Sequence, residues 1–82
     1  MAADADAWLS DVGLALGVPV PEVLTEEIQE EILGLTGQIA HNVTRVAVPW
    51  TSYLIGIAVG RGATPAAALR MVHELLPGGP EQ

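Results

Sequence analysis

The stretch TEEIQEEILGLTGQIAHNVTRVAVPWTSYLIGIAVG, residues 25–60, decides the fold of this 82-residue chain. Thr25 offers an N-cap and two glutamates follow it, which is the pattern that opens a helix. Beyond them, apolar residues recur every three or four positions and form one continuous stripe. Its members are Ile28, Ile32, Leu35, Ile39, Val43 and Val46. The spacing predicts one long helix that extends from Thr25 to about Ala47, with Pro49 starting or kinking the next.

The helix expected after Pro49, near residues 50–60, is apolar almost all round. It contains Tyr53, Leu54, Ile55, Ile57, Ala58 and Val59, and these leave no polar face. A helix of this kind must be central in the fold or covered by a partner.

Two more helices are expected on either side of this pair. The first runs from about Asp4 to Leu16 and ends at Gly17, and the connector GVPVPEV is stiffened by its prolines. Its expected buried stripe is Ala5, Trp8, Val12, Ala15 and Leu16. The last helix is capped by Thr64 and begins at Pro65. Its expected inward residues are Leu69, Val72, Leu75 and Leu76.

The pattern as a whole predicts an all-α fold. It is a small bundle of about four helices, with one long central helix followed by a proline-started apolar helix. The chain 1–82 is expected to be a single helical domain with a frayed tail over 76–82.

Charge and composition narrow the classes of function. The net charge of −7 opposes binding to nucleic acid and to anionic membrane surfaces. The chain has no cysteine, so thiolate metal sites are excluded, and we expect neither a metal nor a cofactor. At 1.5 Å per residue the uncharged run 46–60 reaches only about 22 Å, which is too short for a membrane span. No secretory signal is recognised, and a cytoplasmic location is expected.

The most distinctive polar feature is the pair His41 and Arg45, four positions apart and therefore on one face of the expected long helix. Gly34 and Gly37 continue that face, and each costs about 0.5–1 kcal/mol relative to alanine in a helix interior. Glycine permits close approach, so a second helix or a ligand is expected to pack there. The alternative is a solvated surface on which Arg45 interacts only with the helix dipole.

Other candidate chemistry is weaker. The four glutamates at 26, 27, 30 and 31 are interpreted as a solvated acidic face, because no histidine follows at the spacing of carboxylate-bridged metal bundles. His73 is interpreted as ordinary surface. Gly56 and Gly60 form a small-residue spacing that favours a helix contact. Thr51 is a candidate cap for the helix after Pro49. No catalytic residues are expected.

A resemblance is carried by IAHNVTRVAVPWTSYLIGIAVGRG, residues 39–62, and by AWLSDVGLALGV, residues 7–18. Both resemble a small actinobacterial domain of unknown function, whose pattern has Ala-His, then Arg, Pro-Leu-Thr, a Phe-Leu pair and Gly-x-x-x-Gly-Arg. The matching positions are Ala40, His41, Asn42, Arg45, Pro49, Thr51, Leu54, Gly56, Gly60 and Arg61. The chain departs from the family at Val46, where proline is frequent, and at Tyr53, where phenylalanine is frequent.

The family is often fused to, or encoded beside, molybdenum-cofactor guanylyltransferase-like proteins and maturation factors of formate dehydrogenases. The resemblance therefore implies a non-catalytic accessory subunit or docking module for a molybdoenzyme or its maturation machinery. The apolar helix and the glycine face separately imply a dimer or a tight hetero-complex. The expected contact residues are His41, Asn42, Arg45, Thr51, Tyr53 and Arg61, with close packing at Gly34, Gly37, Gly56 and Gly60. The alternative is a sensor that binds a small anion through His41, Arg45 and Arg61, because arginine suits phosphate.

Overall fold

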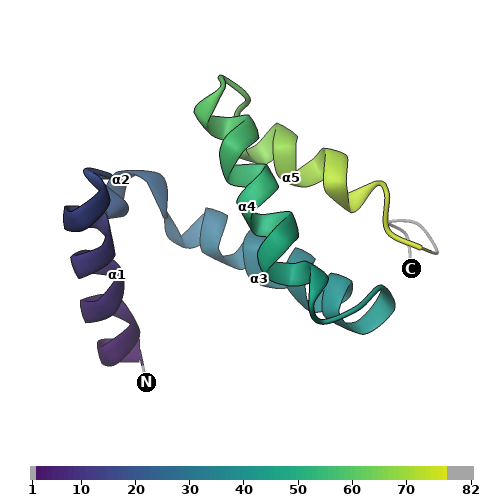
Figure 1. Ribbon diagram of the computed structural model, residues 1–82, viewed down its shortest axis with the longest axis horizontal. Helices are drawn as coiled ribbons and strands as arrows, with labels where there is room; N and C mark the ends of the chain where they lie inside the picture. Colours follow the sequence, from purple (N-terminus) through teal and green to yellow (C-terminus); the bar gives the residue numbers. More distant parts are fainter. Residues whose placement is uncertain (1, 78–82) are drawn as a thin grey trace.

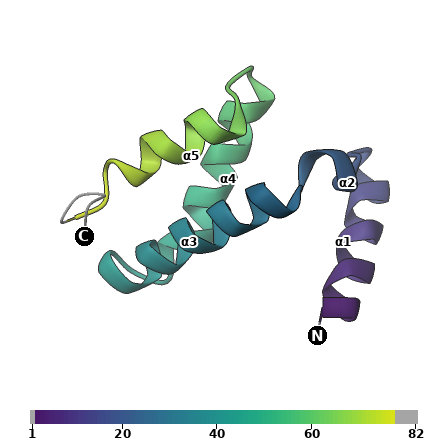
Figure 2. The same cartoon turned by 180° about the vertical axis from the view of Figure 1, so that it is seen from behind.

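The computed structural model describes the backbone of residues 2–77 and the side chains of residues 5–77. In this part of the chain the helices are α1 (Ala2–Leu16), α2 (Val20–Val23), α3 (Glu26–Asn42), α4 (Ala47–Gly60) and α5 (Pro65–His73). Helices α3, α4 and α5 pack on one another, while α1 packs mainly on α2 and stands to one side (Figures 1 and 2). The prediction of a small all-α bundle is confirmed, with one short helix, α2, beyond the expected four.

Threonine side chains start two of the helices, as the sequence predicts. The Thr25 hydroxyl accepts a hydrogen bond from the Ile28 amide at 3.2 Å, and the Thr64 hydroxyl accepts one from the Ala67 amide at 3.2 Å. Pro65 follows its cap directly and begins α5. Each hydroxyl satisfies an amide of the first turn that has no partner within the helix.

The long central helix is shorter than predicted, because α3 ends at Asn42 rather than near Ala47. Val43 leaves the helical region, and the Thr44 amide donates back to the Ile39 carbonyl at 3.0 Å. Had the helix continued, the ring of Pro49 would have met the carbonyl of Arg45. The break places Pro49 in the first turn of α4 instead, where a missing amide hydrogen costs nothing.

The core lies where α3, α4 and α5 meet. Its buried side chains are Leu35, Ile39, Leu69 and Leu76. The half-buried side chains packed against them are Ile28, Ile32, Ala47, Val48, Ile55 and Val72. The predicted stripe is therefore confirmed as far as Ile39, whereas Val43 and Val46 are more than half exposed because the helix has ended.

Two expectations about the C-terminal part are wrong. Leu75 is 81% exposed, because α5 ends at His73 and the following turn directs Leu75 outward. Leu76 belongs to the core, so the tail does not begin at residue 76. The remainder of the expected tail, residues 78–82, lies outside the described residues.

The last turn of α1 and the connector to α3 together form a tight elbow, which we define as residues 13–25. Gly17 has a φ of +71°, and the Val18 amide donates to the Gly13 carbonyl at 2.9 Å. A methyl group at Gly13 would overlap Val20 and lie 2.8 Å from the Val18 carbonyl oxygen. The stiff connector expected here thus contains one helical turn, α2, with Pro21 in it.

The predicted buried stripe of α1 is largely wrong. Trp8 is 66% exposed and Leu16 is 71% exposed, and Ala5 and Ala15 are also exposed. Val12 is half-buried. The main neighbour of α1 is α2, which has only one turn. Helix α2 is therefore too short to cover a stripe that runs the length of a 15-residue helix.

Candidate functional site

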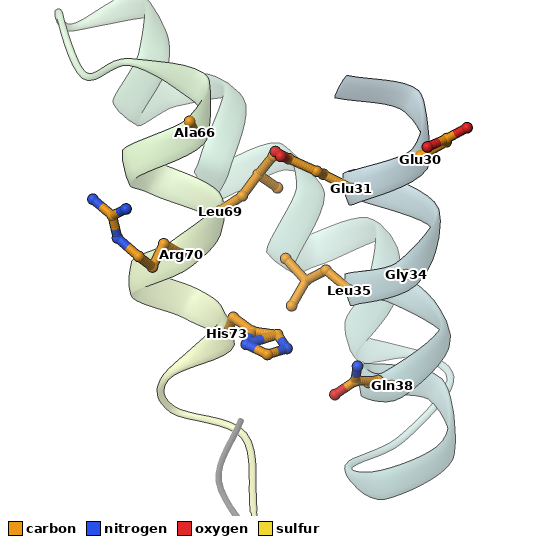
Figure 3. Close-up of a pocket in the computed structure, with 9 residues that line it drawn as sticks. All are labelled: Glu30, Glu31, Gly34, Leu35, Gln38, Ala66, Leu69, Arg70 and His73. Atoms are coloured by element: carbon orange, nitrogen blue, oxygen red, sulfur yellow. The ribbon is translucent and has the colours of Figure 1, made fainter. Parts of the chain in front are cut away.

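A groove of about 380 Å³ runs between α3 and α5, and the core leucines Leu35 and Leu69 contribute to its lining. Glu31 and Gln38 on α3 and His73 on α5 point into the space between the two helices (Figure 3). The other lining residues are Glu30, Gly34, Ala66 and Arg70. Glu30 and Arg70 point away from the groove in the same view.

The groove combines an apolar floor with a carboxylate, an amide and an imidazole. Its volume is at the lower end of the range for small-molecule pockets. None of its lining residues carries a hydroxyl or a thiol that could act as a nucleophile. Across the described residues, no group of three or more histidine or acidic side chains is placed to hold a metal ion.

His73, which the sequence analysis interprets as ordinary surface, has a half-buried side chain that lines the groove. A helical spacing could have revealed the groove. His73 is four residues after Leu69, and Glu31 is four residues before Leu35. Residues four apart share a helix face, so each polar side chain lies one turn from a core leucine.

The predicted contact residues do not gather at one place. His41 and Asn42 are the last two residues of α3, and Arg45 lies in the turn before α4, so the expected stacking of His41 on Arg45 along one helix is wrong. Both side chains are exposed. Thr51 is not the cap of α4, whose N-cap residue is Val46. Thr51 is half-buried and lines a second, smaller pocket beside Ile39.

The two predicted arginines lie beyond opposite ends of α4. Arg45 precedes the helix and Arg61 follows it directly. A helix of 14 residues is roughly 21 Å long, because each residue rises 1.5 Å. One small anion therefore cannot contact both guanidinium groups.

The glycines predicted to permit close packing have open space around them in the described structure. No atom outside the local backbone lies within 4 Å of the position that a Cβ would take at Gly34, Gly37, Gly56 or Gly60. The expected close approach is thus not made at these four glycines within the described residues. It is made instead at Gly13, which the sequence interpretation missed.

Large apolar side chains are exposed along one side of α4, at the spacing of a single helix face. We define the α4 face as Trp50, Tyr53, Leu54 and Ile57, whose side chains are 63%, 71%, 64% and 38% exposed. The opposite side of α4 contributes Val48 and Ile55 to the core. Of the two alternatives expected for this apolar helix, the central position is not found, because the described residues leave its outer face uncovered. Cover by a partner stays a prediction. No described helix is both long and apolar enough to cross a membrane.

The fold and these surfaces define a small all-α domain with a shallow groove and an uncovered apolar helix face. The chain belongs to the family described as a domain of unknown function (DUF6457), whose model matches residues 1–81. This finding confirms the expectation of a small domain of unknown function. The comparisons with curated proteins and with solved structures gave no match.

Proposed function

We propose that this protein is a non-catalytic accessory or docking module that binds another protein chain through the α4 face. The observation that carries the proposal is the alignment of four large, exposed apolar side chains on one helix. Monomeric proteins rarely expose a contiguous apolar patch of more than a few hundred Å², and larger patches are typical of interaction sites.

The residues of the α4 face suit a protein interface. Tryptophan, tyrosine and arginine are the residue types that contribute most binding energy in protein interfaces. Trp50 and Tyr53 supply the apolar centre, while Arg45 and Arg61 lie beyond the two ends of the helix. No acidic residue occurs between positions 32 and 73. The complementary surface is therefore apolar at its centre and acidic at its rim.

The resemblance described above supplies the class of partner. We propose a molybdenum-cofactor enzyme, such as formate dehydrogenase, or a factor that matures its cofactor, in an actinobacterial cytoplasm. The described chain presents a groove without a nucleophile and no metal cluster, so the chemistry in such a complex belongs to the partner.

The alternative function, a sensor for a small anion, has weaker support. It requires His41, Arg45 and Arg61 to converge, and α4 separates the two arginines. Inorganic phosphate in a heat-stability screen tests this alternative. A rise in the melting temperature that disappears in Arg45→Ala would favour the sensor over the docking module.

Affinity capture of the tagged full-length chain from its own cells tests the proposed function. We expect a molybdoenzyme or maturation factor to be enriched with the wild-type chain and lost at least tenfold with Leu54→Asp. The matched control is Leu33→Asp, at a residue of α3 that is 70% exposed and lies outside the α4 face. Arg45→Ala should weaken the contact by roughly 1–3 kcal/mol, because a charged hydrogen bond is lost.

Two results of the capture would refute the proposed function. One is the absence of any molybdenum-cofactor protein above the level found with an untagged strain. The other is equal recovery of that protein with wild-type and Leu54→Asp, which would show that the α4 face takes no part.

A further inference from the structure

The charges of this chain are divided sharply along the sequence. Eight of the ten acidic residues lie within residues 1–31, which contain no basic residue. All three arginines lie within residues 45–70, where there is no acidic residue. Helix α1 is therefore acidic, whereas α4 and its flanking turns are basic, and the two segments are electrostatically complementary.

Helix α1 is itself largely uncovered. Its large apolar side chains Trp8, Leu14 and Leu16 are 66%, 81% and 71% exposed. Asp6 and Asp11 are exposed on the same helix. Helix α1 thus combines exposed apolar side chains with acidic neighbours, as the surface complementary to the α4 face should. Each chain thus carries both an uncovered acidic helix and an uncovered basic, apolar face.

The elbow separates the two surfaces within one chain. The Val18–Gly13 hydrogen bond and the close packing of Gly13 against Val20 fix α1 relative to α2. At the other end, the Gln29 side-chain amide donates to the Leu24 carbonyl at 2.9 Å, next to the Thr25 cap of α3. Figures 1 and 2 show α1 directed away from the three packed helices.

We propose that α1 of a second copy covers the α4 face, in a symmetric dimer in which the two chains exchange their N-terminal helices. This inference rests on the proposed function, because it concerns the same surface. In the free protein α1 of a second copy covers the α4 face, and the partner chain displaces it. A two-fold axis makes the contact twice, since the same pair of surfaces meets on both sides.

The available area is sufficient for such a dimer. A fully buried aromatic side chain removes about 150–250 Å² from water. Trp8, Trp50 and Tyr53 are each about two-thirds exposed. Two reciprocal contacts would bury roughly 600–1,000 Å² from these aromatics alone, and the adjacent leucines bring the total near the ~1,200 Å² at which stable interfaces begin.

Sedimentation of the purified full-length chain is the first test. We expect the wild-type chain to be dimeric at tens of micromolar. Trp8→Asp and Leu54→Asp should each raise the dimer dissociation constant at least tenfold, whereas Leu33→Asp should not. Circular dichroism checks folding, which should survive because all three positions are largely exposed. A wild-type monomer, or a Trp8→Asp dimer as tight as wild type, overturns the exchange.

The absence of cysteine from the sequence allows a second, geometric test. A chain with Ala15→Cys, on the Trp8 side of α1, is mixed with a differently tagged chain that carries Leu54→Cys. We expect a mixed disulfide on mild oxidation, and much less of it with Ser10→Cys, which is exposed on the opposite side of α1. Equal cross-linking from the two positions overturns the assignment of α1 as the occupant.

The two proposals fail in different ways. If Trp8→Asp dimerises normally while Leu54→Asp still loses the cellular partner, the exchange is wrong and the docking function stands. If the dimer tests succeed but no molybdenum-cofactor protein is captured, the α4 face serves self-assembly alone.

Discussion

Replacing Leu69 by alanine should remove a large part of the stability of the fold. Leu69 is 6% exposed and packs with Leu35, Ile39 and Leu76, where the three main helices meet. Removing three buried carbons at about 0.8 kcal/mol each gives about 2.4 kcal/mol. The cavity left behind adds to this loss, and measured leucine-to-alanine changes in cores span about 2–5 kcal/mol. We expect about 3 kcal/mol, because the adjacent groove allows partial collapse.

The assay is urea unfolding of the full-length chain, followed by circular dichroism at a fixed protein concentration. A domain of 82 residues has an expected unfolding free energy of about 4–12 kcal/mol, so the loss should be evident as a lower midpoint. The matched control is Leu75→Ala, the same chemical change at a residue that is 81% exposed. It should alter stability by no more than about 0.5 kcal/mol. A loss for Leu75→Ala as large as that for Leu69→Ala would refute the packing described here.

The remaining predictions concern caps and glycines and use the same unfolding assay. Thr64→Ala should lower the unfolding free energy by about 1 kcal/mol, because it removes the cap of α5. The control Thr44→Ala, in an exposed turn, should be near neutral, and equal effects of the two changes would contradict the role of the cap. Gly34→Ala should stabilise by about 0.5–1 kcal/mol, because open space surrounds that helical position. Gly62→Ala should destabilise by roughly 1–2 kcal/mol, because Gly62 has a φ of +113°. The same sign for both glycine changes would contradict the backbone assignment.

Much of the fold follows from local signals in the sequence. Thr25 and Thr64 each precede a helix, and their caps need only the hydroxyl and the next turn of chain. The buried stripe from Ile28 to Ile39 follows from the helical period. Gly17 ends α1 with a positive φ, which glycine adopts without steric cost. Each of these features depends on residues within one helix and its end.

Most of the features that the sequence analysis missed depend on how the helices pack. The position of the break before Pro49 is the exception, because the apolar stripe continues through Val43 and Val46 while the proline decides locally where the helix ends. The groove beside His73 does depend on packing, since it exists only because α5 packs along α3. The helical spacing predicted a buried stripe on α1, but it could not show that only α2 packs closely against that helix.

The placement of α1 has a consequence for the time scale of its motions. Its main contact is a helix of one turn, so little tertiary packing supports its 15 residues. An isolated helix of this length is marginal in water and exchanges between helix and coil in about a microsecond or less. In the free chain, the amide hydrogens of α1 should therefore exchange with solvent much faster than those of α3. Binding of α1 to a surface would then order a fluctuating segment, and part of the interaction energy would offset the entropy lost in that ordering.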